Sequence, residues 1–418
     1  MQRHMPILMQ DAVFGSRRRE QTAKGTQSRG RQDRFRTRLF PRNPASFTTW
    51  IPARFITWIP ACLGARVLAL PVALPVALPG ALVVALAFAL AFALSSARAF
   101  DLQGHRGARG LAPENTLPAF ERAMALGVTT LELDVGITHD GYLVITHDQA
   151  LNPDITRGPD GQFLVVRGPL IFASTFEALQ RYDVGRINPA SRYAQTFSAQ
   201  RPVDGARIPL LTALFERVAE LGVEASEMRF NIETKLDPRQ PHATAAPEPF
   251  ARALIAAIRT AGLTRRATIQ SFDWRTLQVV QREAPEIGTV YLSAQQRWLD
   301  NIGAGPHPAS GAATGATEAA PSPWTAGLRY TDHGSVPKMV KAAGGKVWSP
   351  FFNDLTPALR EEARALGLPV VVWTVNDPVD IARMLDLGVD GIISDRPDLV
   401  REEMARRGMA LPRRIEVR

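Results

Sequence analysis

From residue 100 to the C-terminus, short apolar runs alternate with longer stretches in which apolar positions recur every three or four residues. Runs of the first kind indicate β-strands, and stretches of the second kind indicate amphipathic helices. The expected strands lie at 101–105, 130–136, 142–146, 229–235, 267–272, 288–293, 346–352, 370–375 and 391–395. The expected helices lie at 116–126, 175–182, 211–221, 249–261, 274–283, 357–366 and 378–387.

Repeated strand–helix units of this size are typical of an α/β protein, and their number favours a (β/α)8 TIM-type barrel. Nine strand-like runs are one more than such a barrel holds. The second and third runs are joined by His139-Asp140-Gly141, and an Asp-Gly turn usually connects antiparallel strands. We therefore expect one of these two runs to lie partly outside the regular barrel, with His139 exposed in the turn.

Two segments interrupt the alternation. Residues 148–210, after the third strand-like run, are rich in Asp, Arg, Pro and Gly and hold one expected helix. An excursion this long inside a compact domain usually covers a functional site, so we interpret it as an insertion beside that site. Residues 301–323 have low sequence complexity and are expected to form a mobile loop.

The pattern is absent from residues 1–66, which contain 13 Lys or Arg and 3 acidic residues and show no apolar periodicity. Such a composition indicates a disordered leader, and a translation start nearer to Arg66 is an alternative explanation. The net charge of +9 also comes from the leader, which has an excess of basic residues, because acidic residues slightly outnumber basic ones from Phe100 onward. We therefore expect no nucleic-acid partner for the folded part.

Residues 67–99 form an apolar segment whose only charge is Arg98. Its proline-free part, Ala81–Leu94, is 14 residues long, which suits a signal-peptide core better than a membrane span. Ala97 and Ala99 form an A-x-A arrangement that predicts cleavage before Phe100. Residues 100–418 are then expected to be an exported domain, periplasmic or secreted, without a membrane span; an uncleaved anchor is the alternative.

Candidate chemistry begins with two carboxylates in the second strand-like run. Glu132 and Asp134 are two positions apart, so both side chains project from the same face of a strand. Neighbouring carboxylates repel one another unless a positive group lies between them, and a divalent cation with oxygen ligands is a common solution. The alternative is an ordinary solvent-exposed strand face.

Two histidines flank this pair at the ends of strand-like runs, His105 after the first and His147 after the third. Strand ends are where α/β barrels gather their catalytic groups. Arg106 follows His105 directly and offers a planar, permanently charged partner for phosphate. A single histidine in such a place is more often structural, so the conjunction of two imidazoles, one guanidinium and two carboxylates carries the prediction of a site.

The residues around these groups contain the stretches HRGARGLAPENTLPAF (105–120) and ELDVGITHDGYLVITHD (132–148). Together they resemble the signature of the glycerophosphodiester phosphodiesterase family, which combines an HRG turn, a PENT helix start, an ELDV strand and an HD pair. The resemblance extends more loosely to the C-terminus and covers nothing before about residue 100. It implies a barrel enzyme that hydrolyses glycerophosphodiesters to sn-glycerol 3-phosphate and an alcohol.

The resemblance also implies roles for individual residues. The three acidic residues Glu132, Asp134 and Glu233 would bind one divalent cation, with Ca²⁺ favoured and Mg²⁺ possible. Arg106 and Lys235 would hold the phosphate. Gln270, Phe272 and Trp373 stand at strand ends that would line the mouth of the site, although core packing is an alternative for the two aromatic residues.

By the same resemblance, His105 and His147 would act as general base and general acid in an attack of the glycerol 2-hydroxyl on phosphorus, and would exchange roles when water opens the cyclic product. Two other functions stay open at this point. One is a lysophospholipase D-like or phosphoinositide-type phosphodiesterase on the same barrel, which would need an apolar rim that the polar insertion does not suggest. The other is an exported binding protein without catalytic activity, which the presence of all expected groups disfavours.

Overall fold

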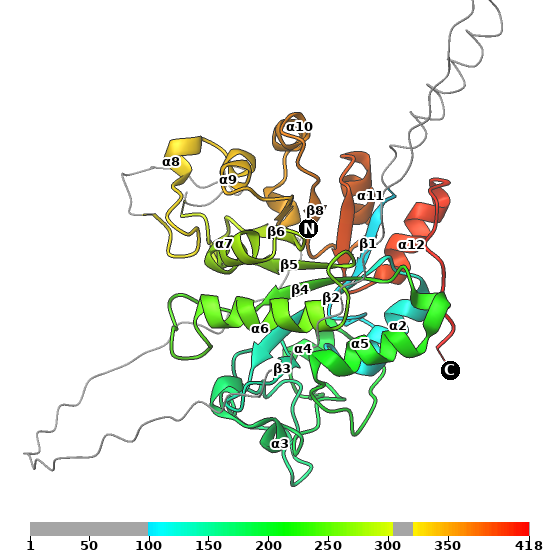
Figure 1. Ribbon diagram of the computed structural model, residues 1–418. Coiled ribbons are helices and arrows are strands. Elements are labelled where there is room, and N and C mark those ends of the chain that lie inside the picture. Colours follow the sequence, from blue (N-terminus) through cyan, green and yellow to red (C-terminus); the bar gives the residue numbers. More distant parts are fainter. Residues whose placement is uncertain (1–98, 304–320, 418) are drawn as a thin grey trace, which may run out of the picture. The chain divides into compact units, whose positions relative to one another are not determined.

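A computed structural model describes residues 99–303 and 321–417 of the chain (Figure 1). The predicted leader, the predicted apolar segment up to residue 98 and the central part of the predicted mobile loop lie outside these residues. Among the described residues, no helix is both long and apolar enough to cross a membrane.

Eight parallel strands form a nearly closed barrel in the order β7-β6-β5-β4-β2-β1-β9-β8. The bridges Trp348–Val370 and Phe351–Trp373 connect β7 to β8 and so bring the two ends of this path together. The barrel strands are β1 (Asp101–Gly104), β2 (Thr130–Ile137), β4 (Arg229–Thr234), β5 (Ala267–Ser271), β6 (Gly288–Ser293), β7 (Val347–Pro350), β8 (Val371–Val372) and β9 (Gly391–Ser394). The predicted (β/α)8 architecture is therefore confirmed.

The ninth strand, β3 (Leu143–Ile145), pairs only with β2 and runs antiparallel to it. Register places Val135 opposite Ile145 and Ile137 opposite Leu143. The expectation that one run of the Asp-Gly hairpin lies outside the barrel is thus confirmed, and His139 is exposed in the turn. Because β3 leaves the barrel wall, the chain after it leads directly into the insertion.

Helices follow most strands on the outside of the barrel (Figure 1). The predicted ones occur as α2 (Leu117–Leu126), α3 (Phe176–Leu179), α5 (Leu211–Glu220), α6 (Pro247–Thr260), α7 (Trp274–Glu283), α10 (Pro357–Ala365) and α11 (Pro378–Asp386). The prediction for α3 is too long: the helix is a single short turn, whose N-terminus is capped by an Asp140 carboxylate and the Thr175 hydroxyl. The helices not predicted are α4 (Arg192–Thr196), α8 (Tyr330–His333), α9 (Val336–Ala342) and α12 (Pro397–Arg406).

The insertion has a small hydrophobic core that is distinct from the main core of the barrel. It contains α3, α4 and a short 3₁₀ helix, η1 (Ile171–Ala173); further 3₁₀ turns outside the insertion are η2 (Gly222–Ala225) and η4 (Phe352–Asp354). Its buried side chains, together with Val144 of β3, are Leu151, Ile171, Leu179, Val184 and Ile208. The insertion is therefore packed structure, beside β3 at the bottom of the view in Figure 1.

Alternation along the barrel strands separates an apolar outside from a polar inside. On β2, Leu131 and Leu133 are fully buried among the helices, whereas Glu132 and Asp134 belong to the other face. Buried polar side chains of neighbouring strands, Asn231 and Gln270, hydrogen-bond to each other at 2.8 Å. The barrel interior thus provides polar partners directly below the carboxyl ends of the strands, where the predicted site residues gather.

Candidate active site

Three carboxylates meet at the carboxyl ends of two adjacent strands. Glu132 and Asp134 project from β2, and Glu233 projects from β4, where it is in register with Asp134. One carboxylate oxygen from each residue lies within 4.8 Å of the other two, and all three residues are buried. The structure thus brings together the three acidic residues predicted as metal ligands.

Burial dominates the electrostatics of this carboxylate triad. Burial, and then the charge of Asp134, raises the pKa of Glu132 well above its ordinary value. Burial also raises the pKa of Glu233 to about 7. Burial opposes ionisation of Asp134 as well, but the Lys235 ammonium and other nearby positive groups outweigh it and lower the pKa of Asp134 below its usual range. Without a cation, the triad therefore retains protons at neutral pH.

The donor set of the triad fits a divalent cation. Asp134 Oδ1 is buried and has no hydrogen-bond partner among the described residues, and Lys235 Nζ lies 3.6 Å from it. An unpaired buried carboxylate oxygen is energetically costly, whereas a bound cation would satisfy it. Ligands that offer only oxygen suit Ca²⁺ or Mg²⁺ better than Zn²⁺.

Arg106 reaches the triad from the turn after β1. Its φ of 49° and that of Gly107, 86°, place both residues in the left-handed region. A Cβ at position 107 would lie 2.6 Å from the backbone carbon of Ala119, so this turn requires glycine. In this conformation the Arg106 backbone N–H donates to Glu132 Oε2 at 2.8 Å, and the Arg106 guanidinium lies 3.4 Å from Asp134 Oδ2.

His105 is held by a carboxylate from the opposite end of the chain. Its Nδ1 lies 2.6 Å from Asp395 Oδ1, and its Nε2 lies 3.9 Å from Glu132 Oε2. Burial lowers the pKa of His105 to about 4, although the Asp395 charge opposes this shift. A neutral imidazole that donates from Nδ1 to Asp395 leaves an unprotonated Nε2 facing the triad, which is the form a general base needs.

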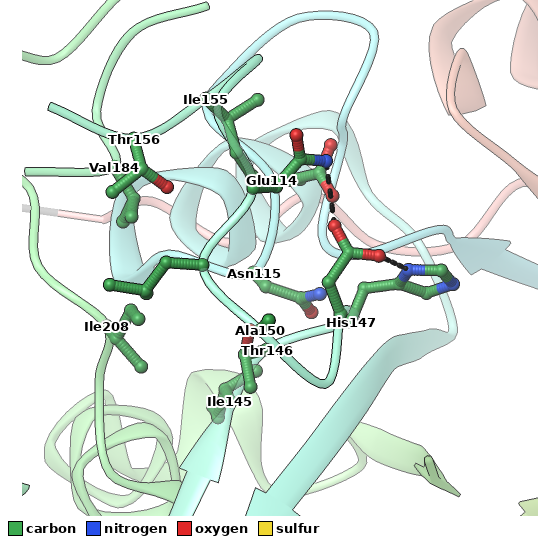
Figure 2. A pocket seen from close by; sticks show the side chains of 13 residues that line it. Glu114, Asn115, Ile145, Thr146, His147, Ala150, Ile155, Thr156, Val184 and Ile208 are labelled. Atoms are coloured by element: carbon green, nitrogen blue, oxygen red, sulfur yellow. Dashed lines mark hydrogen bonds and ion pairs between the residues drawn. The ribbon is translucent and has the colours of Figure 1, made fainter. Parts of the chain in front are cut away.

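His147 has a similar partner in Asp148, whose Oδ1 lies 3.0 Å from His147 Nδ1. Asp148 also accepts a hydrogen bond from Asn152 at 2.7 Å, so the first residues of the insertion fix this carboxylate. Figure 2 shows the pair at the edge of a pocket between the end of β3 and the insertion. Burial, and then the nearby Arg106 charge, lowers the pKa of His147.

Three more predicted residues form a series of contacts that begins at the triad. Lys235, directly after β4, donates to Glu233 Oε1 at 2.8 Å and lies 6.0 Å from the centre of the Phe272 ring. Phe272 packs edge-on against Trp373 with ring centres 5.2 Å apart. Trp373 is half-buried and contacts the rings of Phe351 and Trp298, so an aromatic wall borders the site.

Gln270 lies deeper than its predicted place at the mouth. Its side chain is 1% exposed, and its Nε2 donates to Glu132 Oε1 at 2.6 Å. The amide of Asn231 donates to Gln270 Oε1 and so fixes its orientation. The structure therefore places Gln270 underneath a carboxylate of the triad, where it orients that carboxylate.

Sequence reasoning did not identify several polar residues that complete the site. Asn115 is one of them, and its Nδ2 donates to Asp134 Oδ2 at 2.9 Å. Glu114 accepts from Arg106 Nη1 at 2.6 Å. Asp395 ends the last strand-like run, and its position at a barrel strand end was the available signal. Each of these residues supports a predicted one.

The arrangement combines a triad suited to a divalent cation, two guanidinium or ammonium groups beside it, and two imidazoles whose Nε2 atoms are not bound by Asp395 or Asp148. Positive charge can stabilise an anionic phosphoryl group, and the imidazoles can move protons. These are the components of phosphodiester hydrolysis.

Comparison with known sequences points in the same direction. The family model described as the glycerophosphoryl diester phosphodiesterase family matches residues 105–399. A glycerophosphodiester phosphodiesterase from Caldanaerobacter subterraneus subsp. tengcongensis is 29% identical over 299 residues, which cover 70% of this chain and 93% of that protein. One from Bacillus altitudinis is 28% identical over 303 residues, covering 72% of this chain and 97% of that protein.

Solved structures of other proteins share this fold. A candidate glycerophosphoryl diester phosphodiesterase from Silicibacter pomeroyi DSS-3 has 33% sequence identity and a TM-score of 0.64, and the match covers 75% of this chain and 96% of that chain. An Oleispira antarctica phosphodiesterase, solved in complex with the product sn-glycerol-3-phosphate, has 21% identity and a TM-score of 0.50. That match covers 73% of this chain and 96% of the other, and it shows likeness of fold alone.

Proposed function

The chain belongs to the glycerophosphoryl diester phosphodiesterase family, and on this premise we propose that it hydrolyses glycerophosphodiesters to sn-glycerol 3-phosphate and an alcohol. The observation that carries the proposal is the buried carboxylate triad together with two nearby histidines, each of which contacts its own carboxylate partner through Nδ1 and so leaves Nε2 for proton transfer. Such a combination supplies both the proton transfers and the positive charge that hydrolysis of an anionic phosphodiester needs.

We assign the divalent cation to Glu132, Asp134 and Glu233, and we favour Ca²⁺ because the ligands are oxygens and an exported protein meets Ca²⁺ in quantity. When bound, the cation supplies positive charge that stabilises the phosphoryl oxygens as negative charge develops on them. Arg106 and Lys235, which already contact the triad, add positive charge to the same place.

His105 is the proposed general base of the first step. Asp395 accepts the Nδ1 proton and keeps the lone pair on Nε2, and the lowered pKa of about 4 keeps the imidazole neutral at physiological pH. The glycerol 2-hydroxyl attacks phosphorus while its proton passes to His105 Nε2. The bond between phosphorus and the oxygen of the leaving alcohol breaks in the same displacement.

His147 is the proposed general acid, and it donates the Nε2 proton to the departing alkoxide. Burial disfavours the protonated imidazole, but Asp148 and an incoming phosphodiester anion both favour it. In the second step the neutral His147 accepts a proton from water as the water attacks the cyclic phosphate. The protonated His105 then returns its proton to the 2-oxygen of glycerol, so both imidazoles end in their initial states.

The proposed function predicts a metal-dependent release of sn-glycerol 3-phosphate. We expect the protein to release it from glycerophosphocholine and glycerophosphoethanolamine in the presence of Ca²⁺ or Mg²⁺, and a chelator to stop the reaction because the triad is then empty. Enzymatic detection of sn-glycerol 3-phosphate in matched reactions with and without chelator provides the measurement. Full turnover in excess chelator would contradict the metal assignment, and release of no product from any glycerophosphodiester would contradict the activity.

We further propose that the protein is exported and begins at or near Phe100. In support, Phe100 packs against the main core and Asp101 N donates to Asp390 O at 2.9 Å, so the first residues after the proposed cleavage site belong to the barrel domain. N-terminal sequencing of the protein recovered outside the cytoplasm is expected to start at Phe100. Recovery of that protein with residues before 66 intact would contradict both cleavage and the later translation start.

A further inference from the structure

One hydroxyl group of the insertion connects two of the residues assigned above to catalysis. Tyr193, on α4, donates its hydroxyl proton to Glu114 Oε2 and accepts a hydrogen bond from Arg109 Nη1 at 3.1 Å. A phenol can donate one hydrogen bond and accept others, so both contacts form at the same time. We infer that Tyr193 is a positioning residue that sets both the phosphate-binding Arg106 and the general base His105, an inference that rests on the proposed function.

The first connection leads to Arg106. Glu114 accepts from Tyr193 with one carboxylate oxygen and from Arg106 Nη1 with the other, at 2.6 Å. Arg106 and Glu114 are each 7% exposed. A buried ion pair keeps one fixed geometry only when the remaining lone pairs of its carboxylate also have hydrogen-bond donors. The phenol of Tyr193 is the donor for the second oxygen of Glu114. Loss of that hydrogen bond frees Glu114 to rotate and lets the guanidinium of Arg106 move with it.

The second connection leads to His105 through Arg109 and Asp395. Arg109 donates from Nε and Nη2 to the two oxygens of Asp395, at 2.7 and 2.9 Å, and is 2% exposed. Asp395 in turn accepts from His105 Nδ1 at 2.6 Å. The bidentate pair fixes the plane of the carboxylate, and the carboxylate fixes the imidazole ring. Tyr193 holds the third nitrogen of the same guanidinium, Nη1, and so limits its rotation.

The segment that carries Tyr193 is docked on the turn that carries Arg109. The Arg109 guanidinium carbon lies 4.5 Å from the centre of the Phe197 ring, and the Phe197 and Tyr193 rings pack edge-on at 4.7 Å. Gln200 Nε2 donates to Arg109 O at 2.7 Å, and Arg201 N donates to Leu111 O at 2.9 Å. The insertion thus completes the arrangement of charged groups beside the active site.

Each connection predicts a separate kinetic signature. Arg106 binds phosphate in the substrate and in the transition state, so the replacement Glu114→Gln is expected mainly to raise KM. His105 acts only during proton transfer, so Arg109→Lys, which cannot form the bidentate pair, is expected mainly to lower kcat. Tyr193→Phe removes only the hydroxyl and is expected to do both, with a fall in kcat/KM of about tenfold to a hundredfold.

The matched control is Tyr182→Phe, which makes the same chemical change in the same insertion. Tyr182 packs against the small core of the insertion, and its hydroxyl has no hydrogen bond within residues 99–303 and 321–417. We expect its kcat and KM to equal those of the unmodified protein. Thermal unfolding and Ca²⁺ titration of all variants separate positioning from loss of fold or metal, and both are expected to change little in Tyr193→Phe.

The double variant Tyr193→Phe with Arg109→Lys decides whether the effect runs through Arg109. If it does, the loss of kcat in the double variant is smaller than the product of the two single losses, because the same contact is removed twice. Kinetic constants of Tyr193→Phe equal to those of the Tyr182→Phe control, or fully multiplicative losses of kcat in the double variant, would overturn the inference. Turnover by the unmodified protein in the same assay tests the proposed function separately.

Discussion

Alanine at Glu132, Asp134 or Glu233 is expected to reduce turnover to background and to remove the divalent cation from the protein. The three residues supply all the acidic ligands of the triad, and the variant site retains only two anionic groups for a doubly charged ion. The cation, Arg106 and Lys235 together stabilise the phosphoryl oxygens, so loss of the cation removes the largest single charge. Calorimetric titration with Ca²⁺ and the release of sn-glycerol 3-phosphate measure the two effects independently.

Asp237→Ala provides a matched control, because Asp237 lies four positions after Glu233 but pairs with the exposed Arg239 and is not part of the carboxylate triad. It should retain both metal affinity and turnover. Metal affinity of Glu233→Ala equal to that of the unmodified protein would show that Glu233 is not a ligand.

Metal affinity is expected to rise with pH. The pKa of Glu132 is raised by burial, and that of Glu233 is raised to about 7, so both carboxyl groups carry protons in the metal-free protein below neutrality. A cation must displace these protons, and its affinity therefore weakens as the pH falls from 8 to 6. Titrations at several pH values, with proton release measured in buffers of different ionisation enthalpy, test this. A pH-independent affinity across this range would contradict the raised pKa values.

The stability of the metal-free protein is expected to fall with rising pH, whereas its metal affinity rises. A carboxyl group whose folded-state pKa is raised destabilises the fold once the pH exceeds its unfolded-state pKa, and this effect is complete above its folded-state pKa. For Glu233 the window lies between about pH 4.5 and about pH 7. Glu233→Gln, which keeps an acceptor for Lys235, should therefore unfold at the same or a higher temperature than the unmodified apoprotein at pH 8. A clear decrease at that pH would contradict the repulsion argument.

His105→Ala and His147→Ala are each expected to lower turnover by about two to four orders of magnitude, the usual size of a general acid–base contribution. Metal affinity should survive in both variants, because neither imidazole is a proposed ligand. The matched control is His139→Ala. Because His139 is exposed in the Asp-Gly turn, this variant should leave turnover unchanged. Loss of the cation from either active-site variant would mean that a histidine coordinates it.

A substrate with a good leaving group separates the two roles. A nitrophenyl ester of sn-glycerol 3-phosphate needs no proton on the departing oxygen, so the variant without the general acid should recover most of its activity. We expect this for His147→Ala and not for His105→Ala, because Asp395 leaves His105 Nε2 with a free lone pair. Recovery of His105→Ala alone would reverse the assignment. Equal losses with both substrates would contradict separate acid and base roles.

Much of the barrel could be predicted from the sequence, because strand and helix periods are local properties. All nine strand-like runs are strands, and the Asp-Gly turn correctly indicated that one of them leaves the barrel. The helices that were missed lie in the insertion, after the low-complexity segment or at the end of the chain. There, short length or weak periodicity leaves capping and tertiary packing to decide whether a helix forms.

The site was predictable where its residues are close together in the sequence. Glu132 and Asp134 share a strand face by spacing alone, and the HRG and HD stretches brought His105, Arg106 and His147 to attention. Glu233 and Lys235 could be added through the family resemblance. The structure brings all of these together, but it places Gln270 below a carboxylate, at a depth that spacing along one strand cannot indicate.

The sequence by itself determined the strand order along the chain, the pairs of residues that share a strand face and the Asp-Gly turn between β2 and β3. Only the tertiary structure decided that Asp395 binds His105 from 290 positions away and that Tyr193, 84 positions from Arg109, holds its guanidinium. The physical reason is that strand periodicity and left-handed turns depend on neighbouring residues, whereas these contacts exist only after the barrel closes and the insertion docks. Buried charges then select whichever partners the fold brings within hydrogen-bond distance.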